Sequence, residues 1–210
     1  MARRKSKTQQ DPEMRLINAA MALAARRRWR DIRIADIAAE AELSTADALA
    51  QGPSKTAILN AFGRHINRAV LDGLRADPEI GDSPKDRLFD LLMRRFDAMA
   101  EYRSGLASIS ADLGFDPFAA LSRLCGIKDA MAVTLEAAGI SAAGPCGVLQ
   151  RHGLSAIYIY CLSIWFRDDS DDMSTTMAAV DRALTFADKV LPRRPNKGPL
   201  ETGATAPAAN

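Results

Sequence analysis

The start of the chain concentrates positive charge. Residues 1–30 contain nine arginine and lysine residues against two acidic ones, Asp11 and Glu13. Clustered basic side chains neutralise phosphate groups, which makes them a common means of contacting nucleic acids. The whole chain of 210 residues has a net charge of only +2, so this property is local. We expect Arg3, Arg4 and Lys5 to contact phosphates, and a disordered, solubilising tail is the alternative for this segment.

The residue types that commonly catalyse reactions or bind metals are not arranged in a recognisable catalytic or metal-binding pattern. The cysteines, Cys125, Cys146 and Cys161, form no CxxC pair, and His65 and His152 are isolated in the sequence. No Ser/His/Asp order, phosphate-binding glycine loop or carboxylate pair is recognisable. We therefore expect no enzymatic activity, no cofactor and no metal site.

The spacing of apolar residues predicts an all-α protein, with start signals at Asp11–Pro12, Ser44 and Ser54. The acidic run 168–172 can be interpreted as a cation site, but we favour helix capping, because negative charge is favourable at a helix N-terminus. The expected helices cover residues 11–27, 33–41, 45–51, 55–74, 84–101, 104–113, 117–138, 148–166 and 173–191.

Two prolines and a glycine in residues 77–84 indicate a junction between two helical domains. We predict a basic, disordered arm at 1–10, one domain at 11–76, a second at 84–191 and a disordered tail at 192–210. An odd number of cysteines behind a charged start favours a reducing, cytoplasmic location. The sequence contains no run of about 18 uncharged apolar residues, so no membrane span is expected.

The order of residues in the first domain is more specific than its helices. It runs Trp29, Ile34, Asp36-Ile37-Ala38, Ala41, Leu43-Ser44, Pro53-Ser54-Lys55 and Ile58-Leu59. Without gaps, this order resembles the N-terminal signature of the TetR family of transcriptional regulators. The resemblance implies a three-helix helix-turn-helix domain, joined by a long fourth helix to a C-terminal helical ligand-binding and dimerisation domain. The implied function is a ligand-responsive, DNA-binding regulator, with repression as its expected effect.

The resemblance also implies DNA-contacting residues. Lys55 is placed like the family's lysine that contacts the DNA backbone. Ser44 is expected to cap the third helix and to lie within reach of a phosphate. Thr45 and Gln51 are the side chains of that helix suited to reading base edges. The expected target is a palindromic double-stranded operator.

Several positions depart from the family pattern. Between Arg33 and Lys55 there are two basic and four acidic residues, so the reading surface has lost positive charge. Asp47 lies within the recognition helix, where a carboxylate can accept a hydrogen bond from cytosine. The replaced family residues are a threonine (Arg33), a turn glycine (Glu42), a tyrosine (Leu49), a histidine (Gln51) and a phenylalanine (Gly52).

The resemblance places an effector pocket and a homodimer interface in the second domain. An apolar or amphipathic effector is expected. Arg94 and Arg95, or Arg123, could pair with an acidic one, although a solvated surface is the favoured interpretation for all three. The expected pocket residues are Phe89, Met93, Phe96, Phe115, Phe118, Leu121 and Met131. Ordinary core packing is the alternative for each of these pocket residues. The expected dimer contacts are Leu154, Ile157, Tyr158, Cys161 and Trp165, and the alternative is that their helix is simply internal core.

A second hypothesis is a lipid- or isoprenoid-binding protein that has lost DNA binding. The accessory proteins of ubiquinone biosynthesis are similar to TetR regulators in fold, and the weak recognition helix favours this alternative. Those proteins contact membranes through a C-terminal amphipathic helix. Residues 192–210 contain only Leu200 as a large apolar side chain, which does not favour such a helix.

Overall fold

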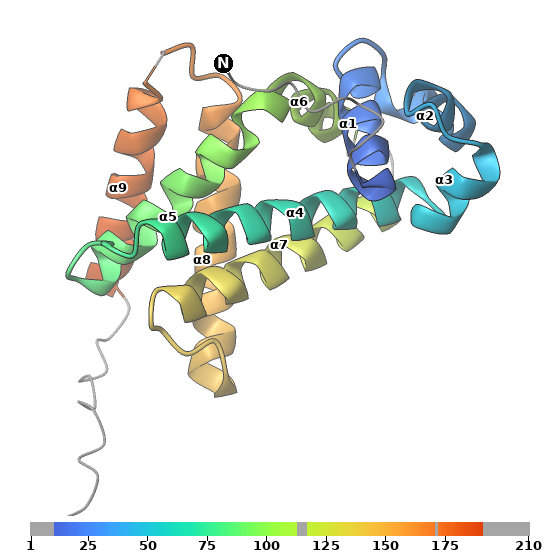
Figure 1. The fold of residues 1–210 in the computed structure, drawn as a ribbon. Helices are drawn as coiled ribbons and strands as arrows, with labels where there is room; N and C mark the ends of the chain where they lie inside the picture. Colours follow the sequence, from blue (N-terminus) through green and yellow to red (C-terminus); the bar gives the residue numbers. More distant parts are fainter. Residues whose placement is uncertain (1–10, 113–116, 171, 191–210) are drawn as a thin grey trace, which may run out of the picture.

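The computed structural model describes residues 11–112, 117–170 and 172–190, without the side chains of 117–125 and 190, and all their regular secondary structure is helical (Figure 1). Short helices α1 to α3 form a head at one end. The long α4 runs from this head along α7 into a body formed by α5 to α9. The helices are α1 (Pro12–Ala24), α2 (Ile34–Glu40), α3 (Thr45–Gln51), α4 (Lys55–Ala76), α5 (Pro84–Met99), α6 (Arg103–Asp112), α7 (Pro117–Ala137), α8 (Gly144–Trp165) and α9 (Ser174–Val190), with short 3-10 helices η2 (Trp29–Asp31) and η3 (Ala100–Tyr102).

Local capping explains where most helices begin. Asp11, Ser44 and Ser54 each accept a hydrogen bond from a backbone N–H of the first turn of α1, α3 and α4. These three predicted starts are confirmed. Helix α8 begins at Gly144, four residues before the predicted start. Pro145 lies in its first turn, where proline is well tolerated because backbone N–H groups there make no intrahelical hydrogen bond.

The turn between α2 and α3 has a left-handed residue. Glu42 has a φ of 55°, a conformation that costs a non-glycine residue about 1–2 kcal/mol. This is the position where the TetR pattern has glycine. Arg15 Nη2 stabilises the turn by donating to the carbonyl oxygens of Ala41 at 2.6 Å and Glu42 at 2.8 Å.

Lys55 connects the start of α4 to η2. Its Nζ donates to the carbonyl oxygens of Trp29 at 2.6 Å and Ile32 at 3.0 Å. The same ammonium lies 4.9 Å from the centroid of the Trp29 ring, within the range of a cation–π interaction. Lys55 therefore holds the segment between α1 and α2 against α4.

Helix α6 connects the head to the body. A Cβ added at Gly105 would lie only 2.6 Å from the carbonyl oxygen of Met21, so glycine permits α6 to pack against the backbone of α1. Asp112 Oδ2 accepts from the backbone N–H of Arg30 at 2.9 Å. At the other end of α6, Arg103 donates to the carbonyl oxygen of Asp168 and lies over the Trp165 ring.

The acidic run after α8 caps α9. Asp168 Oδ2 accepts from Thr176 N at 2.7 Å and Thr176 Oγ1 at 2.6 Å, and its Oδ1 accepts from Ser170. Burial raises the pKa of Asp168, but the hydrogen bonds from Ser170 and Thr176 outweigh it and leave the pKa below its ordinary value. Within the described residues, no group of three His, Cys, Asp or Glu side chains could hold a metal ion.

One apolar core continues from the head into the body. It includes Leu16 and Ile37 in the head and Phe96, Met131 and Trp165 in the body, all buried. The predicted division at 77–84 corresponds to the turn between α4 and α5, but apolar packing crosses it. The predicted arm and tail fall outside the described residues, and no described helix has the length and apolar character needed to span a membrane.

We predict that Lys55→Met lowers the free energy of unfolding by about 2–3 kcal/mol, because two carbonyl acceptors lose a charged donor while the aliphatic stem is kept. Urea denaturation measures this change. Lys189→Met, at an exposed position of α9, is the matched control and should change stability by less than about 0.5 kcal/mol. Equal effects of the two substitutions would contradict the connecting role of Lys55.

We predict that Asp168→Asn flattens the acid side of the stability profile. A carboxyl group with a lowered pKa in the folded state stabilises the protein above its unfolded pKa of about 4, and this stabilisation is lost as the pH falls below that value. Urea denaturation between pH 7 and pH 3 should therefore show a wild-type advantage of about 2 kcal/mol that shrinks with acidification. Asp169→Asn, at the exposed neighbouring residue, should retain the wild-type pH dependence. A constant difference between Asp168→Asn and wild type at all pH values would refute the prediction.

Candidate nucleic-acid interface and ligand cavity

Helix α3 presents a nearly neutral outer face. Ala48 is fully buried and anchors α3 in the head, whereas Thr45, Leu49 and Gln51 are exposed. Leu49, in the place of the family's tyrosine, is 43% exposed and offers only apolar contact. The two predicted base-reading side chains are therefore accessible from solvent.

Ser44 and Asp47 are occupied with each other. Ser44 Oγ accepts from Asp47 N at 3.0 Å and donates to Asp47 Oδ2 at 2.6 Å. Since a serine hydroxyl has a single proton to donate, this pairing uses the donor that a phosphate would need. The predicted cap is confirmed, but the phosphate contact of Ser44 remains a prediction that requires the Asp47 hydrogen bond to break. Asp47, considered as a possible cytosine acceptor, stabilises the helix start instead.

Lys55 is also engaged inside the head, through its contacts with Trp29 and Ile32. A phosphate contact by its ammonium would compete with these internal acceptors. The basic residues Arg3, Arg4 and Lys5 lie outside the described residues. Seven residues were predicted to contact DNA. Of these, Thr45 and Gln51 are the two that lie within α3, and both side chains are exposed.

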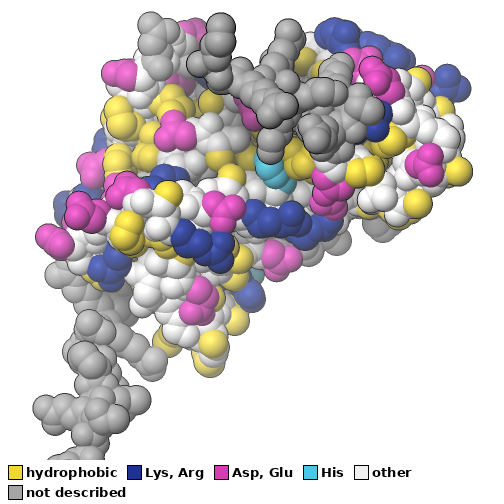
Figure 2. Space-filling model, in the orientation of Figure 1, with side chains coloured by type: hydrophobic (Ala, Val, Ile, Leu, Met, Phe, Trp, Pro, Cys, Tyr) yellow, Lys and Arg dark blue, Asp and Glu magenta, His cyan; other side chains and the backbone are white. Residues whose placement is uncertain are grey.

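The acidic residues of α2 are paired with arginines. Arg26 contacts Glu40 at 2.8 Å, and Arg33 Nε lies 3.6 Å from Asp36. The backbone N–H of Arg33 donates to Asp36, and this bond together with the charges of Arg33 and Arg27 lowers the pKa of Asp36. Lys and Arg side chains gather at the upper right margin of Figure 2, over the region of α1 and α2. Counting residues 26–55 gives six basic against five acidic side chains, so these pairs compensate much of the negative charge near the head's outer face.

Gly52 replaces the family's phenylalanine for a visible reason. A Cβ at Gly52 would lie 2.7 Å from Ile58 Cγ1 and 3.1 Å from Leu16 Cδ2. Ile58 and Leu16 are themselves fully buried. Other apolar side chains thus fill the space beside residue 52, and the departure from the pattern leaves the packing of the head intact.

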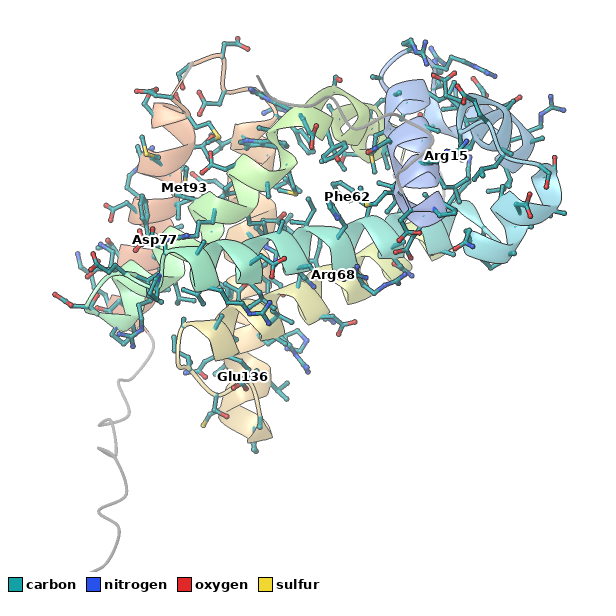
Figure 3. All side chains as sticks on the ribbon, viewed as in Figure 1. Arg15, Phe62, Arg68, Asp77, Met93 and Glu136 are labelled. Atoms are coloured by element: carbon teal, nitrogen blue, oxygen red, sulfur yellow. The ribbon has the colours of Figure 1, made fainter. Side chains whose placement is uncertain are left out.

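A cavity of about 410 Å³ lies among α4 to α8. Its mouth lies between α4 and α7, where the lining residues Asn60, Arg64, Gly126 and Asp129 are exposed. Its buried wall has the lining residues Phe62, Ile66, Arg95, Met99, Leu106, Ala130 and Tyr158. Figure 3 labels Phe62 on the side of α4 that faces α6.

The predicted pocket residues do not line this cavity where they are described. Phe96 and Met131 are fully buried core residues, and Phe89 and Met93 are half-buried against the core. The side chains of Phe115, Phe118 and Leu121 lie outside the described part of the chain. The cavity uses α4 and α8, which the sequence interpretation had assigned to the connection and the dimer interface.

Arg95 is the cavity residue whose environment the sequence interpretation missed. It is 3% exposed rather than solvated, and its Nη2 donates to Asn67 Oδ1 at 2.6 Å. Burial lowers the pKa of Arg95 below its usual value. A signal was present in the sequence, because Arg95 follows Leu91 by four residues and precedes Met99 by four, which places it within an apolar helix face.

The predicted dimer contacts on α8 need a correction. Leu154, Tyr158, Cys161 and Trp165 are buried in the chain's own core, where Phe96 packs against Tyr158 and Trp165. Burial raises the pKa of the Cys161 thiol to about 11. Internal packing therefore explains the apolar stretch that the sequence interpretation assigned to a partner. Only Ile157 lines a second, shallow groove on α8 and α9, whose other lining residues are Gly153, Ala156, Tyr160, Arg182, Ala183, Phe186 and Ala187.

Comparison with known proteins identifies the fold. No family model matches the sequence, and no curated protein sequence matches it significantly. Among solved structures, a TetR transcriptional regulator from Nitrosomonas europaea superposes with a TM-score of 0.68 at 22% identity, covering 86% of this chain and 100% of its own. A TetR transcriptional regulator from Rhodococcus sp. RHA1 superposes with a TM-score of 0.58 at 17% identity, covering 83% of this chain and 94% of its own. The chain has the all-α fold of the TetR transcriptional regulators.

Proposed function

We propose that this protein is a ligand-responsive transcriptional regulator of the TetR type, which binds a palindromic DNA site as a homodimer and represses transcription. The observation that carries the proposal is the geometry of α3. This helix is capped by Ser44 and anchored by Ala48, and it carries Thr45 and Gln51 on its exposed face. A helix held in this way at the end of a domain is suited to enter a major groove.

The charge distribution divides the proposed DNA contact into two parts. Thr45 and Gln51 supply the base-edge contacts, since threonine and glutamine can both hydrogen-bond to bases. Most of the affinity comes from the basic residues of the arm, Arg3, Arg4 and Lys5, because α3 itself carries no positive charge. Lys55 supports this interface by fixing the head rather than by contacting phosphate.

Two chains of contacts support communication between the cavity and α3. Phe62 lines the cavity and packs edge-on against Tyr102 at 5.1 Å between ring centroids, and Tyr102 donates to Asn18 of α1 at 3.2 Å. Leu106 also lines the cavity and follows Gly105, which packs against α1. A ligand that displaces Phe62 or Leu106 would therefore move α1 and, through it, α3.

The groove on α8 and α9 supports the proposed dimer. Phe186 and Tyr160 are 68% and 52% exposed, and small residues at Gly153, Ala156 and Ala183 lie beside them. In a two-fold contact each large side chain fits beside the small residues of the other subunit. The interface thus uses the outer faces of α8 and α9, while their inner faces form the core.

The alternative of a lipid-binding protein without DNA binding is not favoured, because the two solved structures compared above are described as transcriptional regulators. It remains the expected identity if the head proves unable to bind DNA.

We predict that in vitro selection from random duplexes at about 50 mM salt, where phosphate contacts are strong, enriches a palindromic sequence. Gln51→Ala and Thr45→Ala should each weaken binding to that sequence by about 1–2 kcal/mol and relax the preference at specific positions. Removal of residues 2–10 should instead weaken binding to all sequences alike. Mobility shifts measure both effects.

Ala39→Ser, at an exposed position of α2, is the control for a small polar change that leaves α3 intact. Failure to enrich any sequence at this salt concentration would rule out the regulator. If only the arm truncation had an effect, α3 would not read bases.

We predict that Phe186→Asp converts the protein from dimer to monomer, because the interface loses a large apolar side chain and must desolvate a carboxylate in its place. Sedimentation velocity measures the oligomeric state. Ala39→Asp adds the same charge at the opposite end of the molecule and should leave the dimer unchanged. A dimer that survives Phe186→Asp would exclude the groove as the interface.

A further inference from the structure

The buried arginine of the cavity points to the class of its ligand. We propose that the cavity binds an organic monoanion consisting of a carboxylate on an apolar body, and that the Arg95 guanidinium binds the carboxylate. This inference rests on the proposed function in that it specifies the effector, but its test needs no DNA.

Arg95 has an unfilled hydrogen-bonding position. Nη2 donates to Asn67 Oδ1 at 2.6 Å, whereas the buried Nε has no acceptor among the described residues. An asparagine amide carries no charge, so it cannot neutralise the guanidinium. Asp129 is the only described carboxylate in the cavity lining, and it is exposed at the mouth.

A buried charge in this position is unfavourable unless an anion faces it. Arginine stays protonated in proteins, and the hydrogen bond to Asn67 offsets only part of the desolvation penalty of a buried cation that no anion faces. The planar guanidinium offers two parallel N–H donors that match a carboxylate. A bound carboxylate would supply both the missing charge and the missing acceptor.

The lining defines the rest of the ligand. Leu59, Ile66, Met99 and Leu106 provide apolar contacts around Arg95. The other described cation of the lining, Arg64, is at the mouth and pairs with Glu13 at 2.9 Å. One buried cation is therefore left for the ligand, which suits a monoanion better than a phosphate dianion. The volume of about 410 Å³ lies in the range of small-molecule sites.

Two glycines keep this space open. Among the described residues, a Cβ added at Gly63, in the middle of α4, would meet no atom within 4 Å, and one at Gly126 of α7 would meet only Asn60 Oδ1 at 3.8 Å. Glycine inside a helix is less stable than alanine. Glycine at positions 63 and 126 therefore makes α4 and α7 less stable than alanine would, and it leaves space in the cavity lining.

Calorimetric titration with matched acids and amides tests the inference. The probes are decanoate, 4-phenylbutyrate and 1-naphthoate, each compared with its primary amide, which keeps the shape and removes the charge. At least one acid should bind wild-type protein, and at least about tenfold more tightly than its amide. Arg95→Gln should abolish this preference, keep the hydrogen bond to Asn67 within reach, and raise the Tm of the empty protein because the buried charge is gone.

Arg94→Gln is the matched control. Arg94 has the same charge and directly precedes Arg95 in α5, but it does not line the cavity. Its guanidinium instead pairs with the Asp77 carboxylate at 2.7 Å. This variant should keep the preference for the acid. Gly63→Leu, which fills the cavity, should abolish binding of acids and amides alike.

Equal affinity for acid and amide, no binding of any acid at about 1 mM, or an unchanged preference in Arg95→Gln would each overturn the inference. The outcome is separable from that of the proposed function. A protein that binds an acid but no DNA would fail as a regulator and keep this inference, and one that binds DNA but no acid would do the reverse.

Discussion

The close packing of α6 against α1 is the contact on which the arrangement of head and body depends. It is possible only because Gly105 has no side chain to meet the Met21 carbonyl. Around this point, Asp112 and Arg103 attach the two ends of α6 to the head and to the turn after α8. The head thus has a second connection to the body besides α4. Because Leu106 of the same helix lines the cavity, the contact that positions the head is also close to where a ligand would act.

The helices could be predicted largely because their start signals are local. Ser44 and Ser54 cap the helices that follow them, and such a bond needs no knowledge of distant residues. The start of α8 was placed too late because Pro145 suits both a turn and a first helical turn. The close approach of Gly147 to the backbone of Ala142, which leaves no space for a Cβ, is visible only in the folded chain. The apolar core that continues across residues 77–84 is likewise a property of the folded chain, which no local pattern reveals.

The candidate site was harder to predict, because its residues take their roles from distant partners. Lys55 binds carbonyl groups 23 and 26 residues earlier in the sequence, which no local pattern reveals. The apolar face of α8 gave no means of distinguishing an internal core from a dimer contact, since both bury leucine and tryptophan equally well. Arg95 was the exception. Its place within an apolar helix face was readable, but without a visible partner the default for arginine is a solvated surface.

The head and the cavity differ in how their polar groups are satisfied. In the head, Arg15 and Lys55 are buried in part and each binds two carbonyl oxygens, so the domain is complete without a ligand. In the cavity, the buried Nε of Arg95 has no acceptor among the described residues, and Gly63 leaves open space in the same lining. Native structures rarely retain such groups, because each lowers stability. Their coincidence in one cavity, joined to the head through Phe62 and Leu106, fits the proposed effector site. A ligand shifts the position of α3 only if it binds two arrangements of the protein unequally. The Arg95 guanidinium would favour the arrangement in which it contacts the proposed carboxylate.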